Sequence, residues 1–192
     1  MSASYIPIIN QLFPNAKIVL DRFHIIQHQG RAMMTTRIAI MKTFVKQSLA
    51  YQAPKNHWRF FQKDSRKLSD KSFYSRTFRQ TLMPREVAKK TLQFSDELRY
   101  YYDLYQFLLF HFQEKRVAEF FGLIEENLNL VNTTFKKVFK TFLKHRKYIT
   151  NALEMPYSSD KLEATNKLIK NIKRLAFGFR KIITSKLRFL SL

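Results

Sequence analysis

The sequence predicts a mainly α-helical protein, and three observations support this prediction. The 192 residues include only 3 Gly and 5 Pro, too few for the turns of a β-sandwich or barrel. Hydrophobic residues make up 45% of the chain and aromatic residues 15%, enough to form a core, so a folded protein is expected. Apolar residues also recur at three- and four-residue spacing through most of the chain, which is the period of amphipathic helices.

The first segments combine a helix with the one predicted strand. Tyr5–Phe13 has the pattern of a short amphipathic helix, which Pro14 ends. Lys17–Leu20 is a short β-branched run and predicts a strand. A lone strand leaves its backbone groups without partners, so its neighbours are expected in another chain or in a missing part.

The remainder is predicted to be helical, starting with a helix from Phe23 to about Leu49 and a basic, aromatic link at Pro54–Lys67. Further helices are expected at Lys71–Leu82, Arg85–Phe94, Asp96–Phe112, Lys115–Glu126, Thr133–Leu153 and Asp160–Leu175. Amphipathic helices bury their apolar face, so the stripes on these helices are expected in the core rather than stacked on nucleic-acid bases. The stripe residues are Tyr101, Tyr105, Leu108, Phe112, Phe135, Phe139 and Phe142.

The charge is strongly unbalanced. Lys and Arg number 35 against 14 Asp and Glu, a formal net charge of +21. A folded chain with this excess repels itself, so a polyanionic partner is expected, with nucleic acid first and an anionic membrane surface second. No apolar run approaches the roughly 18 residues of a membrane-spanning helix, and the absence of Cys excludes disulfides and cysteine zinc sites. A cytoplasmic protein is expected.

Two groups of residues could carry chemistry. On the helix after Asp160, Glu163 shares a face with Lys167, Lys170 and Arg174. A carboxylate that holds a divalent metal beside cations that hold phosphates suits a nuclease-like site. An ordinary ion pair between Glu163 and Lys167 on a solvated helix explains the same spacing.

The second group follows the predicted strand. Asp21, His24 and His28 could bind a metal if their side chains converge. The simpler alternative is that Asp21 caps the following helix and His24 packs at the junction between strand and helix.

Two blocks of this sequence closely resemble bacterial insertion-sequence transposases of the DDE type, in the ISL-three family. The first, from Leu12 to Gln27, reads L-F-P-N-A-K-I-V-L-D-R-F-H-I-I-Q. The second, from Pro156 to Arg180, reads P-Y-S-S-D-K-L-E-A-T-N-K-L-I-K-N-I-K-R-L-A-F-G-F-R and resembles the family pattern S-N-G-x-x-E-G-x-N-x-x-I-K-x-x-K-R. Both blocks occur in the family's order, with a helical stretch between them.

The resemblance implies a fold and a domain organisation. The family has an RNase H-like α/β core that a large helical insertion interrupts. The chain is accordingly expected to hold a remnant of that core, one strand plus helices, at residues 1–22, an all-helical insertion at residues 23–155, and a C-terminal core helix with a basic tail at residues 156–192.

The resemblance also assigns site residues. Glu163 matches the third catalytic, metal-binding acid, and Asp21 and His24 match the family's D-x-x-H motif. The cations expected to bind DNA are Lys167, Lys170, Lys173, Arg174 and Arg180. The sequence departs from the family pattern at Ser159, Asp160 and Ala164, and an extra carboxylate at Asp160 is expected to cap the helix rather than alter a metal site.

The intact family enzyme uses Mg²⁺ or Mn²⁺, held by three acids, to cleave and transfer DNA strands. The first two acids are expected upstream of Met1, so this chain is interpreted as a truncated transposase that binds no metal productively and has no strand-transfer activity. Two alternatives remain: a non-catalytic basic nucleic-acid-binding protein, or an inhibitory partner of the full-length transposase. The expected partners are therefore DNA and either full-length transposase or further copies of this chain.

Overall fold

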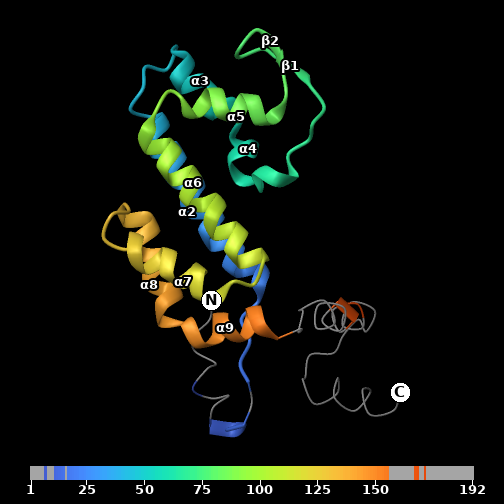
Figure 1. The fold of residues 1–192 in the computed structure, drawn as a ribbon, viewed down its shortest axis with the longest axis vertical. Helices are drawn as coiled ribbons and strands as arrows, with labels where there is room; N and C mark the ends of the chain where they lie inside the picture. Colours follow the sequence, from blue (N-terminus) through green and yellow to red (C-terminus); the bar gives the residue numbers. More distant parts are fainter. Residues whose placement is uncertain (1–6, 8–10, 16, 156–166, 169–170, 172–192) are drawn as a thin grey trace, which may run out of the picture. The chain divides into compact units, whose positions relative to one another are not determined.

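The computed structural model describes residues 7, 11–15, 17–155, 167–168 and 171 of the chain. The chain divides into two compact units, Met1–Pro156 and Tyr157–Leu192. The described residues are mainly helical, as the sequence predicts, and form eight α-helices with one small two-stranded antiparallel sheet (Figure 1). The division of the chain into a core remnant, an insertion and a C-terminal core helix stays a prediction.

With the labels of Figure 1, the elements follow each other in this order: α2 (Arg22–Met41), α3 (Leu49–Asn56), α4 (Trp58–Gln62), the 3-10 helix η1 (Ser65–Lys67), β1 (Phe73–Ser75), β2 (Gln80–Leu82), α5 (Pro84–Leu92), α6 (Asp96–Gln113), α7 (Val117–Asn127), α8 (Thr133–Lys144) and α9 (Arg146–Glu154). None of the helices in the described ranges is long and apolar enough to cross a lipid bilayer.

Helix α2 is the centre of this arrangement. It packs along α6, as Figure 1 shows, and also contacts α3, α4, α8 and α9. Because five helices pack against it, α2 buries polar as well as apolar side chains, among them Gln29, Thr36 and Arg37. At Gly30 an added Cβ would lie 3.4 Å from the hydroxyl oxygen of Tyr105, so the two long helices approach closely there.

The core between α2, α6, α7, α8 and α9 is rich in aromatic rings. Tyr101 of α6 stacks on Phe135 of α8 with ring centroids 5.2 Å apart. Phe120 of α7 contacts both Phe112 and Phe142, at 5.6 and 6.0 Å between centroids. All seven residues of the predicted aromatic stripes are buried, which confirms their place in the core.

Asn132 joins three of these helices. Its side-chain oxygen accepts a hydrogen bond from the backbone N–H of Phe135 at 3.0 Å and so caps α8. Its amide nitrogen donates to the hydroxyl of Thr36 on α2 at 2.9 Å, and its backbone N–H donates to the Tyr101 hydroxyl on α6 at 2.7 Å. One side chain therefore fixes the register of α8 against α2.

The prediction of a helix at Lys71–Leu82 is wrong, and the segment expected as an all-helical insertion, residues 23–155, therefore contains a small sheet. Phe73, Tyr74 and Ser75 pair with Leu82, Thr81 and Gln80 in an antiparallel hairpin. Phe73 and Phe78 of this segment pack on the ring of His57, with centroids 6.2 and 6.0 Å apart, and His57 also stacks on Phe60 of α4 at 5.7 Å. Burial there lowers the pKa of His57. Tertiary contacts of the aromatic side chains thus favour the hairpin over a helix.

The predicted strand at Lys17–Leu20 is also wrong, because this segment belongs to no sheet. Its backbone instead finds partners on α9. The side-chain amide of Asn151 donates to the carbonyl oxygen of Ile18 at 2.9 Å, and the N–H of Leu20 points to the carbonyl oxygen of Tyr148 at 3.5 Å. Two backbone groups of this segment are therefore paired with α9 rather than with a neighbouring strand.

Other boundaries differ in detail. The helix predicted at Thr133–Leu153 is divided into α8 and α9 at His145, and the link at Pro54–Lys67 contains α4 and η1. The long first helix ends at Met41 rather than near Leu49. Within the helix predicted at Tyr5–Phe13, the structure describes Pro7, Gln11 and Leu12 as helical and Phe13 as non-helical. The other residues of this range lie outside the described residues.

Replacing Asn132 should show how strongly α8 is held. We expect Asn132→Ala to lower the free energy of unfolding by about 2–3 kcal/mol, because it removes a helix cap and leaves the buried Thr36 hydroxyl unpaired. Asn132→Asp keeps the acceptor that caps α8, and the Thr36 hydroxyl can rotate to donate to the new carboxylate, so this variant should cost less than about 1 kcal/mol. Urea denaturation followed by circular dichroism measures both values, and equal losses in the two variants would contradict this role.

Candidate functional site

Asp21 and His24, the predicted D-x-x-H motif, lie at the start of α2. Asp21 is the N-cap of the helix, and its Oδ1 accepts a hydrogen bond from the backbone N–H of Phe23 at 2.8 Å. His24 does not pack at a junction as expected, because 58% of its side chain is exposed, with Nε2 at 3.8 Å from Asp21 Oδ2. The capping alternative therefore describes Asp21 correctly.

A metal site formed by Asp21, His24 and His28 finds no support. No group of three or more His, Cys, Asp or Glu side chains in the described part of the chain could hold a metal ion. Partial burial lowers the pKa of His28, and the nearby charge of Arg31 lowers it further. His28 therefore tends to stay neutral, in cationic surroundings that disfavour a further positive charge.

Arg22, between the two motif residues, connects the start of α2 to the end of α9. Its guanidinium donates to the carbonyl oxygen of Ala152 and, at 2.6 Å, to that of Met155. Carbonyl groups at the end of a helix lack intrahelical partners and carry partial negative charge, which a guanidinium satisfies. No local pattern in the sequence indicates this contact, because 130 residues separate Arg22 from Ala152.

A pocket of about 570 Å³ opens beside Arg22. Ile26, Phe112 and Leu153 give it apolar lining, and most of its other lining residues are charged. The full set comprises Arg22, Ile26, Arg66, Lys67, Phe112, Gln113, Glu114, Lys115 and Leu153. Four separate segments supply these residues, so sequence reasoning missed the pocket.

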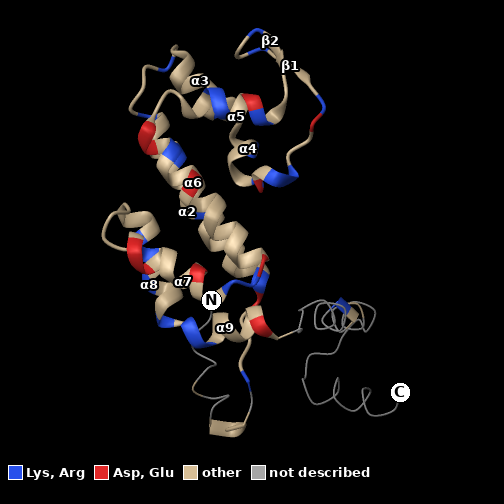
Figure 2. Ribbon diagram, viewed as in Figure 1, with Lys and Arg blue, Asp and Glu red and all other residues tan. Residues whose placement is uncertain are grey.

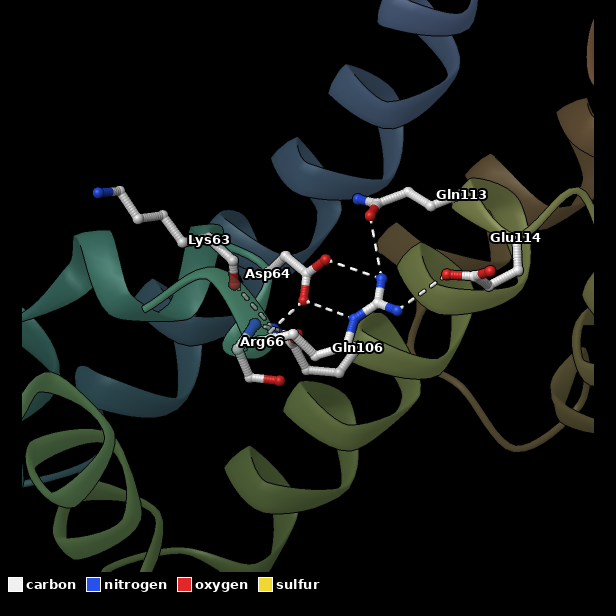
Figure 3. A network of polar contacts seen from close by, with 7 residues as sticks. Lys63, Asp64, Arg66, Gln106, Gln113 and Glu114 are labelled. Carbon is white, nitrogen blue, oxygen red and sulfur yellow. Dashed lines mark hydrogen bonds and ion pairs between the residues drawn. The ribbon is translucent and has the colours of Figure 1, made fainter. Parts of the chain in front are cut away.

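Arg66 organises one side of the pocket (Figure 3). Its guanidinium donates to both carboxylate oxygens of Asp64, at 3.2 and 2.9 Å, and to Gln113 and Glu114 at 3.0 and 3.1 Å. Burial raises the pKa of Asp64, but the hydrogen bonds and charge of Arg66 outweigh that effect and bring it below its ordinary value. Asp64 thus stays ionised and holds Arg66 in place.

Gln106 of α6 fixes the loop that carries this network. Its side chain accepts from the N–H of Ser65 at 2.9 Å and donates to the carbonyl oxygen of Lys63 at 3.0 Å (Figure 3). The loop is therefore attached to the same helix that supplies Gln113.

The remaining cations of the pocket are Lys67 and Lys115, and neither forms an ion pair with any described residue. Lys115 also has a φ of 56°, a left-handed conformation that is costly for a residue with a Cβ. Exposed cations beside apolar lining residues can bind an anionic ligand that has an apolar part. The pocket is thus suited to an anionic ligand.

Of the predicted DNA-binding residues, only Lys167 belongs to the described part of the chain. Lys167 is described, helical and exposed. Glu163, Lys170, Lys173, Arg174 and Arg180 lie outside the described residues. Their predicted roles remain predictions.

Comparison with known proteins identifies the family. The family model of the ISL3 (ISL-three) DDE transposases, described as "Transposase", matches residues 1–189, and the chain therefore belongs to this family. A protein of Lactococcus lactis subsp. lactis named "ATP-dependent protease" is 35% identical over 105 residues, which cover 55% of this chain and 34% of that protein. The chain thus spans about a third of the length of this relative. No solved structure matches the chain.

The contact between Arg22 and α9 can be tested by substitution. We expect Arg22→Gln to lower the free energy of unfolding by about 1.5–3 kcal/mol, because it removes charge-assisted hydrogen bonds to two carbonyls. The control Arg99→Gln removes an exposed ion pair to Asp96 and should cost about 0–1 kcal/mol. Hydrogen exchange should speed up in the last turn of α9 only for the Arg22 variant, and unchanged exchange there would show that the contact does not hold this helix end.

Proposed function

We propose that this member of the ISL3 transposase family acts in DNA transposition as a DNA-binding chain that carries one metal-binding carboxylate, Glu163. The observation that carries the proposal is the formal net charge of +21 in a chain of this family. DDE transposases act on DNA, and cations that neutralise phosphates supply most of the affinity of sequence-independent DNA binding.

The DNA-binding residues proposed first are Lys167, Lys170, Lys173, Arg174 and Arg180. From residue 161 to the end of the chain, nine Lys and Arg accompany a single acid, Glu163. The exposure of Lys167 supports contact with a phosphate. Phosphate contacts position a protein on DNA without reading its sequence, so binding is expected to be poorly sequence-specific.

Glu163 is proposed as a ligand of the metal ions. The DDE transposase family typically uses Mg²⁺. Within the described ranges no three metal-ligating side chains converge, and Glu163 lies outside them. The proposal for the remaining residues of this chain therefore concerns how they bind and hold DNA.

Two further functions are compatible with the same charge: a non-catalytic nucleic-acid-binding protein, and an inhibitory partner that associates with full-length transposase. Glu163 within its motif favours a role in transposition, because a pure binder has no need of that carboxylate. Proteolysis, the activity in the name of the Lactococcus relative, is not carried over, since the match covers only 34% of that protein.

The activity of the 192 residues by themselves can be measured on supercoiled plasmid and on duplexes with transposon ends. We expect neither nicking nor joining with Mg²⁺ or Mn²⁺, because a single carboxylate of the triad cannot position two ions. The variant Glu163→Gln is the matched control. Cleavage that this variant abolishes would show that other acids of the chain complete the site, and cleavage that survives in it would reveal a different site.

DNA binding itself is tested by the salt dependence of affinity. Fluorescence anisotropy should give a steep negative slope of log affinity against log salt, similar for unrelated duplexes. Replacing Lys167, Lys170 and Arg174 by Gln should make the slope shallower by about 2–3, roughly one for each phosphate that the variant no longer neutralises. The same substitution of Lys137, Lys140 and Lys144, exposed cations of α8, removes equal charge and should change the slope by less. A salt-insensitive affinity, or a strong preference for one short sequence, would refute the proposal.

A further inference from the structure

The positive charge of the described residues is concentrated in one region, residues Lys42–Leu92, here called the basic lobe. It contains α3, α4, η1, the β1–β2 hairpin and α5. The basic lobe has thirteen Lys and Arg but only three acids, Asp64, Asp70 and Glu86. From Asp96 to Glu154, by contrast, nine Lys and Arg stand beside eight acids. Figure 2 shows the sparse acidic residues around the hairpin and the mixed charges of α6 to α9.

The hairpin at the edge of the basic lobe presents two arginines to solvent. Its four-residue loop runs from Arg76 to Arg79, and the two middle residues anchor it. Thr77 accepts a hydrogen bond from the side-chain amide of Asn56 at 3.0 Å, and Phe78 stacks on His57 with centroids 6.0 Å apart. Arg76 and Arg79 are both exposed, and neither forms an ion pair with another described residue.

Arg79 occupies a backbone position that suits glycine better. Its φ is 52°, in the left-handed region, where a side chain with a Cβ carries a steric cost. Glycine adopts this conformation freely and is the usual residue of such turns. The backbone at position 79 therefore accepts glycine without strain, so Arg79→Gly removes the side chain and leaves the turn in place.

The shape of the hairpin fits a groove of duplex DNA. A two-stranded β-ribbon is one of the two elements that the major groove of B-form DNA admits. On this ribbon Tyr74 is 62% exposed, and Gln80 and Thr81 are exposed too, so the ribbon offers hydrogen-bonding groups to a partner. In the segments that flank it, Lys71 and Arg85 are exposed cations available to the phosphates beside the groove.

We infer that the basic lobe is a second DNA-binding surface, in which the β1–β2 hairpin enters the major groove of duplex DNA and Arg76 and Arg79 at its tip contact the strand backbone. This inference rests on the proposed function for its partner, DNA. It is independent of the cations from Lys167 to Arg180, because none of them belongs to the lobe.

The test replaces the tip arginines and leaves the fold intact. In the double variant Arg76→Gln/Arg79→Gly, the slope of log affinity for duplex DNA against log salt should become shallower by about 2. The control Lys137→Gln/Lys140→Gln on α8 removes the same charge and should change the slope by less than half as much. Arg79→Gly alone should not lower the thermal midpoint, since glycine accepts the left-handed backbone.

A duplex RNA of the same sequence tests whether the hairpin enters the major groove. The major groove of A-form RNA is deep and narrow, so the ribbon cannot enter it. The double variant should therefore lose much more affinity for DNA than for RNA. Equal losses on both duplexes would overturn insertion of the hairpin, and equal effects of the tip and α8 variants would overturn the second surface.

The same titrations separate this inference from the proposed function. If replacing Lys167, Lys170 and Arg174 flattens the slope while the tip variant leaves it unchanged, the hairpin inference fails and DNA binding by the chain stands. If the unaltered chain shows no salt-dependent binding to duplex DNA, the proposed function fails, and the hairpin inference fails with it.

Discussion

The packing of helix α2 against five other helices is the constraint on which the rest of the described structure depends. The face of α2 that packs against α3, α4, α6, α8 and α9 is buried, so the polar side chains on that face need partners inside the protein. Thr36 finds Asn132, and the Arg37 guanidinium donates to the carbonyl oxygen of Pro54. The side-chain amide of Gln29 makes no hydrogen bond with any described residue, so both its nitrogen and its oxygen are buried without a partner there.

The same helix positions both the pocket and the basic lobe of the first unit. At its start, Asp21 caps it and Arg22 binds the last turn of α9, next to the pocket with Lys67 and Lys115. At its other end, Arg37 contacts Pro54 of α3, the first helix of the basic lobe. Burial lowers the pKa of Arg37, yet a guanidinium titrates so far above neutrality that it stays charged. One continuous helix therefore links the motif that resembles the family's D-x-x-H to the lobe that holds most of the net positive charge of the described residues.

The sequence predicted the helices whose patterns are local and missed the elements that depend on distant partners. Helices α5, α6 and α7 begin and end within a few residues of their predicted ranges, because their apolar spacing and caps lie within each segment. The hairpin was predicted as a helix because its turn has Arg79, not Gly or Asn, at the left-handed position, and because the rings of His57 and Phe60 that stabilise it come from another segment. Lys17–Leu20 has the composition of a strand, but it lies against α9, where Asn151 donates a hydrogen bond to the carbonyl oxygen of Ile18. For the site, the sequence indicated Asp21 as a cap, but no local pattern could reveal the pocket, whose lining comes from four segments.

The role of α2 as a single continuous support is tested most directly by native-state hydrogen exchange at increasing denaturant concentration, read amide by amide. If α2 is held along its length, its buried amides from Ile25 to Ile40 should open with one common free energy, equal to that of global unfolding. The amides near Arg37, beside the basic lobe, should then be as protected as those near Ile25. Opening of the half next to the lobe at a distinctly lower free energy would contradict this role of α2, because the lobe and the pocket would then move as independent parts.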